Sequence, residues 1–134
     1  MKKFIGCERG SASIEFVALA LPLFVPIIFF LHQFALVSGQ EEIARTLARE
    51  GARAFVSSSE QSSAAVAMSA VILRAGRELG LTDAEFERMA VNLECSSSPC
   101  YSPNGKIIVT VHFGATKEFP SVTASAQEYV SPWS

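Results

Sequence analysis

The sequence predicts an α+β fold: a long N-terminal transmembrane helix, then a second helix packed against a small C-terminal antiparallel sheet. Three observations predict it. A strongly apolar run covers residues 14–37. Apolar residues recur at helical spacing in residues 41–56, and the period changes to two in residues 106–113. A period of two is typical of a strand that buries one face.

Length and charge limit the classes of protein that fit. At 134 residues, the chain has room for one small domain beside the apolar run. That domain has few apolar residues left for its core, so we expect it to be marginally stable alone. The net charge of -2 gives no basic field. We therefore expect no nucleic acid partner.

The apolar run is long enough to cross a membrane. A helix needs about 20 apolar residues to span a bilayer core of about 30 Å, and 16–37 supplies them, interrupted only by His32 and Gln33. A removed secretory signal, cleaved after Gly39, is the alternative. Because the apolar part of such a signal is usually only about 7–15 residues long, a retained helix in a lipid bilayer is favoured.

Basic residues near the run leave its orientation open. Three precede it and three follow it: Lys2, Lys3, Arg9, Arg45, Arg49 and Arg53. The positive-inside rule therefore gives a tie.

Two prolines lie inside the predicted span. Pro22 and Pro26 are four residues apart and so share one helix face. Each lacks an amide donor and blocks a carbonyl one turn earlier. We expect a helix kink at these positions, which is either simply tolerated or belongs to a helix built to pack beside others.

The helix is predicted to continue beyond the membrane to residue 56, because only Ser38 and Gly39 could interrupt it. One face carries the residues expected to be buried: Ile43, Ala44, Leu47, Ala48, Gly51, Ala54 and Phe55. Arg45, Arg49 and Arg53 form a column on the other side, which we interpret as a solvated face.

Residues 57–63 are predicted to be a polar loop before the second helix, at 64–79. The buried face of that helix is predicted to include Val66, Ala70, Leu73 and Leu79. Gly80 can end the helix. Thr82 and Glu85 then form a capping box for a short third helix.

The strongest predicted strand is 106–113, with plausible partner strands at 90–95 and 122–130. The sequence SPNG at 102–105 supplies turn chemistry between the first two strands. These segments predict the small antiparallel sheet.

No motif indicates catalysis. The sequence has no glycine-rich phosphate loop, no nucleophile elbow and no His and Cys pairs at metal-binding spacing. We therefore expect a protein that is not an enzyme, with no cofactor, no metal and no small-molecule substrate. His112, on a strand, is interpreted as structural.

Cys95 and Cys100 lie close together in the sequence. A disulfide is favoured if this half of the chain lies outside the cytoplasm. It would close a short loop and contribute roughly 2 kcal/mol. Reduced thiols remain the alternative.

Glu15 places a carboxylate at the start of the apolar run. Such a group is costly near a membrane unless it finds a partner. Cleavage between Gly10 and Ser11 would create an α-amine at Ser11. That amine would stand one helical turn from Glu15, or would approach the Glu15 of a neighbouring subunit.

The segments RGSASIEFVALALPL (9–23) and AREGARA (48–54) carry a family resemblance. Gly10 before a cleavage position, Glu15 with Phe16, and Pro22 follow in a characteristic order and spacing. Over about residues 9–56 the chain resembles the TadE-like proteins, minor pseudopilins of the tight-adherence (Tad/Flp) type IVb pilus.

The resemblance implies a pilin-like fold and a structural role in pilus assembly. A prepilin peptidase would remove residues 1–10 as a leader, leaving a long helix at 11–56 and a small extracytoplasmic domain at 57–134. Glu15 and Phe16 would act in subunit assembly. The partners would be other pilins or pseudopilins and Tad assembly proteins. The protein would sit in the plasma membrane with its N-terminus in the cytoplasm.

Two other classes of protein stay open. One is a small secreted domain released after Gly39. The other is an unrelated single-pass membrane subunit. The mature N-terminus separates the three readings, because it would be Ser11, Gln40 or Met1.

Overall fold

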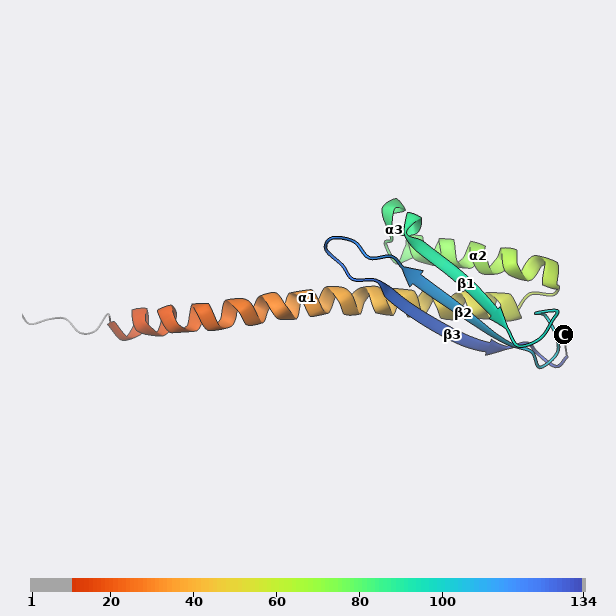
Figure 1. Cartoon of the computed structure of the whole chain (residues 1–134), viewed down its shortest axis with the longest axis horizontal. Coiled ribbons are helices and arrows are strands. Elements are labelled where there is room, and N and C mark those ends of the chain that lie inside the picture. Colours follow the sequence, from red (N-terminus) through yellow and green to blue (C-terminus); the bar gives the residue numbers. More distant parts are fainter. Residues whose placement is uncertain (1–10, 134) are drawn as a thin grey trace, which may run out of the picture. The chain divides into compact units, whose positions relative to one another are not determined.

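The computed structural model describes residues 11–133, with side chains from Ser13 onward. Its elements are three helices followed by three strands (Figure 1). They are α1 (Ser11–Val56), α2 (Gln61–Glu78), α3 (Asp83–Glu87), β1 (Met89–Cys95), β2 (Lys106–Phe113) and β3 (Val122–Tyr129). The predicted α+β class is confirmed.

The chain forms two compact units that divide within α1, one ending at Leu36 and the other beginning at Val37. The first contains the apolar part of α1. The second contains the rest of α1, both other helices and the sheet. The second unit is called the packed unit below.

The three strands form one antiparallel sheet in the order β1-β2-β3. In its register, Val109 of β2 lies opposite Leu93 of β1 and Ala126 of β3. The central strand β2 alternates strictly between buried and half-buried residues. This is the pattern predicted from its period of two, and both partner strands are where the sequence placed them.

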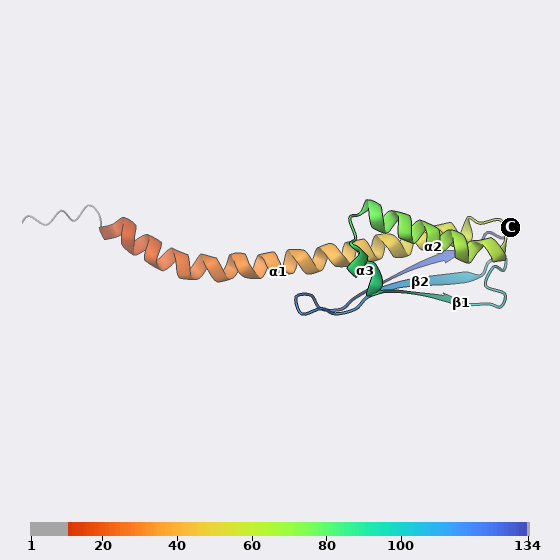
Figure 2. The same ribbon diagram turned by 90° about the horizontal axis from the view of Figure 1, so that it is seen from above.

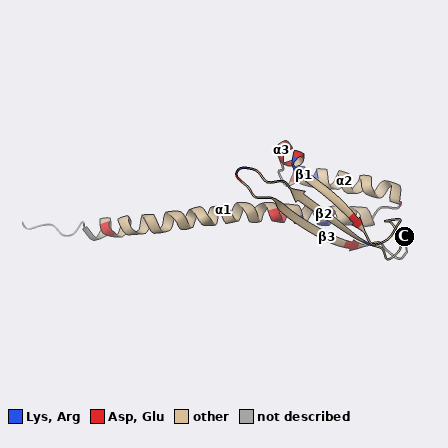
Figure 3. Cartoon of the chain, in the orientation of Figure 1, with Lys and Arg blue, Asp and Glu red and all other residues tan. Residues whose placement is uncertain are grey.

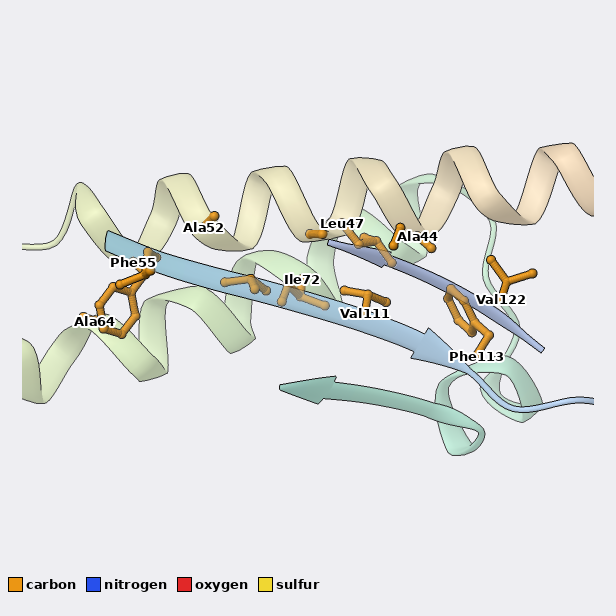
Figure 4. Packing of buried hydrophobic residues seen from close by; sticks show 13 residues of the cluster. Ala44, Leu47, Ala52, Phe55, Ala64, Ile72, Val111, Phe113 and Val122 are labelled. Atoms are coloured by element: carbon orange, nitrogen blue, oxygen red, sulfur yellow. The ribbon is translucent and has the colours of Figure 1, made fainter. Parts of the chain in front are cut away.

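The core of the packed unit lies between the helices and one face of the sheet. Figure 2 shows α2 and the adjoining part of α1 on one side, with the strands on the other. Figure 4 shows side chains from both layers meeting. The largest fully buried side chains are Phe55, Phe113, Leu47, Ile72, Ile107, Val109, Val111 and Val130. Helix and strand therefore depend on each other for burial.

The predicted buried face of α1 is confirmed in most positions. Ala44, Leu47, Ala48 and Phe55 are buried, and Gly51 is buried with them. The absence of a side chain at Gly51 lets α2 come close, since a Cβ there would lie 2.7 Å from Cδ1 of Ile72.

The predicted buried face of α2 is wrong. Val66 is 67% exposed and Leu73 is 48% exposed, and Ala70 and Leu79 are exposed as well. The helix instead buries Ala64, Ile72 and Gly76, at spacings of eight and four residues. The sequence offers apolar residues on two faces of this helix, and the close approach of α1 selects the face with the small residues.

Local signals at the helix ends are confirmed. Thr82 and Glu85 form the predicted capping box at the start of α3. Gly80 follows α2 with a φ of +85°, a left-handed conformation that glycine adopts without strain. Between β1 and β2, the amide of Gly105 donates to the carbonyl of Ser102 at 2.8 Å, so the predicted turn forms.

Candidate functional site

The apolar part of α1 exposes its side chains along its whole length. Phe16 is 72% exposed and Phe24 is 56% exposed. Within the described chain, α1 is the one helix long and apolar enough to span a membrane. Figure 3 shows no charged residue on α1 between Glu15 and the acidic residues that begin at Glu41. Apolar side chains that find no contact within the chain require another apolar environment, which a bilayer supplies.

The predicted processing and assembly residues lie at the start of this helix. Gly10 lies outside the described residues, and Ser11 is the first residue of α1. Glu15 follows Ser11 by one helical turn and is exposed, as is its neighbour Phe16. The helix therefore presents both side chains outward, where a partner can reach them. Their roles in cleavage and assembly stay predictions.

Both prolines lie inside α1, and the helix continues through them. Figure 2 shows the helix axis bending in its red to orange part, which holds both residues. Pro26 also lines an open groove with Val25, Phe29, Phe30 and Gln33. Both prolines lie on the same side of the helix. On that side, two backbone N–H groups of a regular helix are absent.

The arginine column on α1 is exposed, and two of its members form ion pairs. Arg45 pairs with Glu41 at 3.0 Å and with Glu42 at 3.3 Å. Arg53 lies 3.7 Å from Glu50 and 3.9 Å from Glu128 of β3. Because these groups are largely solvated, each pair contributes little to stability. This agrees with the interpretation of a solvated face.

Cys95 and Cys100 are brought to disulfide distance, with their sulfur atoms 2.16 Å apart. Cys95 ends β1, so the pair fixes the start of the loop that leads to β2. Tyr101 follows directly: its ring packs 6.3 Å from that of Phe55, and its hydroxyl donates to the carbonyl of Ser58. The cysteine loop is therefore fastened to the end of α1.

Arg88 is a second connecting residue that sequence reasoning missed. It donates to the carbonyl of Gly114 at 2.8 Å, lies 3.5 Å from Glu85, and stands over the ring of Phe113. It thereby joins the segment after α3 to the end of β2. A basic residue between a helix and a strand gives no local signal of these contacts, because Gly114 is distant in the sequence.

The histidines occupy peripheral positions. His112 lies on β2 and its Nδ1 is 2.7 Å from the hydroxyl of Thr123 on β3, a cross-strand contact that fits a structural role. His32 is exposed on α1. In the described part of the chain, no group of three or more His, Cys, Asp or Glu side chains is arranged to hold a metal ion.

Comparison with protein families gives one match. The family model described as "TadE-like protein" matches residues 10–53. No curated protein and no solved structure is similar enough to this chain to count as a match. The matched range contains the predicted cleavage position, Glu15, both prolines and both glycines of α1. Residues 10–53 are therefore similar to the TadE-like family.

Proposed function

We propose that this chain is a membrane-anchored minor pseudopilin of a Tad/Flp type IVb pilus. The observation that carries the proposal is the TadE-like match over residues 10–53. It coincides with the one described helix apolar enough to enter a membrane. The family is associated with the Tad pilus and consists of pilus components, so the role is structural and not enzymatic.

In the proposed pathway, a prepilin peptidase cuts between Gly10 and Ser11. The cut removes Lys2, Lys3 and Arg9, the basic residues before the span. It leaves an apolar helix that can move from the bilayer into an assembly with other pilins and Tad proteins. The N-terminus faces the cytoplasm before cleavage. The domain at 57–134 lies outside, where the cysteine pair can be oxidised.

Glu15 acts in assembly. The new α-amine of Ser11 is a cation within reach of the Glu15 carboxylate, on the same chain or on a neighbour. Ion pairing between them lowers the cost of holding the carboxylate in an apolar setting. The outward position of Glu15 and Phe16 on α1 supports contact with another subunit.

Processing is tested by determining the mature N-terminus of membrane-extracted protein and of a Gly10→Leu variant. We expect Ser11 in the natural chain and an uncut, longer precursor in the variant. A normally sized mature variant would contradict the proposal. A mature N-terminus at Gln40 would instead support the secreted alternative, which would release a nearly complete packed unit, because that unit begins at Val37.

The role of Glu15 is tested by a Glu15→Ala variant, with membrane level by immunoblot and surface pili counted in the same cells. We expect at least normal accumulation, because a charge that is costly near the membrane has been removed, together with fewer pili. Glu41→Ala is the matched control: it removes a carboxylate from the same helix, beyond the span, where its partner is Arg45. Normal piliation with Glu15→Ala, or failure of that variant to accumulate, would refute the assembly role.

A further inference from the structure

One face of α1 carries Glu15, both prolines and Gln33, whereas His32, the other polar residue of the span, lies on a different side. Glu15, Pro22, Pro26, Phe29 and Gln33 follow one another at spacings of seven, four, three and four residues. Such spacings place all five on one side of a helix. We call this side the proline face.

Between residues 16 and 37, the opposite side of the helix carries no hydrogen-bonding side chain. It is formed at spacings of four, three, four and three residues by Ala20, Phe24, Ile27, Leu31 and Phe34. An entirely apolar side is suited to lipid. The span is therefore two-sided, and the proline face is the side that gains most from contact with protein.

The backbone of the proline face also lacks hydrogen-bond donors. Pro22 and Pro26 have no N–H, so the carbonyls of Ala18 and Pro22 lose the donors that a regular helix would give them. These carbonyls lie on the same side, since 18, 22 and 26 are four residues apart. In hydrocarbon, water cannot replace the missing donors, and such breaks are tolerated where a neighbouring helix covers them.

Gln33 adds a hydrogen-bonding group to this face. Its side chain is exposed and borders the groove beside Pro26. Among the residues that the structure describes, it forms no hydrogen bond. A carboxamide has two N–H donors and one carbonyl acceptor, so it needs a partner when it lies within a membrane.

We propose that a second copy of this chain packs on the proline face within the membrane, with the two Gln33 carboxamides hydrogen-bonded to each other. Two copies inserted in the same direction place Gln33 opposite Gln33 at the same depth. A carboxamide is complementary to itself because each copy donates an N–H and accepts at its carbonyl. The groove beside Pro26 receives apolar side chains of the second copy. This inference rests on the membrane anchoring in the proposed function.

The test is oxidative cross-linking of the full chain in native membranes, in a Cys7→Ser background. Phe29→Cys places a thiol on the proline face. Leu31→Cys is the matched control, because it lies about 3 Å away along the axis but on the opposite side. We expect a cross-linked homodimer at position 29, at least about threefold more abundant than at position 31.

The contribution of Gln33 is measured in the Phe29→Cys background. Gln33→Leu should lower the cross-linked fraction about threefold or more, as expected for loss of a hydrogen bond between helices in a membrane. His32→Leu changes a polar residue at the same depth on another side and should leave the fraction unchanged. Equal cross-linking at positions 29 and 31, or no effect of Gln33→Leu, would overturn the proposal.

Two further measurements separate this inference from the proposed function. Alkaline extraction shows whether each variant is inserted, and the mature N-terminus shows whether it is processed. Inserted and processed protein without a homodimer refutes the second copy alone. A cross-linked product of any other mass also refutes it, because the face is then covered by a different protein. Protein that is not inserted refutes both.

Discussion

Phe24 and Phe113 are the same side chain in opposite surroundings. Phe24, in the apolar part of α1, is 56% exposed, whereas Phe113, at the end of β2, is 1% exposed. None of the side chains described in the first unit, at 13–36, is buried, so they rely on an outside apolar environment. The packed unit buries its apolar residues between its own helices and sheet. Apolar composition alone therefore does not say where a protein obtains its stability.

The largest expected effect comes from making the same change in both units. Phe113→Ala should lower the free energy of unfolding of the packed unit by about 3–5 kcal/mol, since it leaves a cavity in the core. Phe24→Ala should leave that stability unchanged. Thermal unfolding in detergent, followed by circular dichroism, measures both variants. Similar melting temperatures for the two would remove the contrast between the units.

Two glycines of α1 sharpen the comparison within one helix. Gly51→Leu should destabilise by about 1–3 kcal/mol or more by overpacking, because even a Cβ there would meet Ile72. Gly39→Leu should not destabilise, because nothing lies within 4 Å of a Cβ at that position and leucine has the higher helix propensity. The same unfolding experiment distinguishes them. Destabilisation by Gly39→Leu as large as that by Gly51→Leu would contradict this difference in packing between the two positions.

The cysteine pair is expected to contribute roughly 2 kcal/mol to the packed unit. Alkylation of unreduced protein, followed by mass spectrometry, should label neither Cys95 nor Cys100. The double variant Cys95→Ser with Cys100→Ser should unfold at a lower temperature. The loop that carries Tyr101 should be less ordered in it. Full labelling of both thiols would mean that this unit does not lie in an oxidising compartment.

The smallest effect is expected on the arginine column. Arg53→Ala should change stability by no more than about 0.5 kcal/mol, because its ion pairs are long and solvated. Arg49→Ala, at a neighbouring exposed position, is the control. A loss above about 1 kcal/mol with Arg53→Ala alone would mean that the contact with Glu128 fastens β3 to α1 more strongly than its geometry implies.

The sequence by itself determined the elements that depend on local interactions. The long apolar run, the capping box at Thr82 and the turn at Gly105 involve residues within a few positions of each other, and each was predicted. The alternation of buried and half-buried residues in β2 is also predicted by the sequence, because a central strand that packs one face against helices buries every second residue. The TadE-like resemblance came from the same short-range order of residues around Glu15.

Only the tertiary structure decided which surfaces meet. Apolar residues occur on two sides of α2, and helical periodicity could not choose between Leu73 and Ile72. Ile72 is the buried one because Gly51 of α1 has no side chain, which leaves room for Ile72 to pack there. Arg88 and Tyr101 likewise gained their roles from Gly114 and Ser58, which are far away in the sequence. Such contacts depend on distances that exist only once the chain has folded, so no local pattern records them.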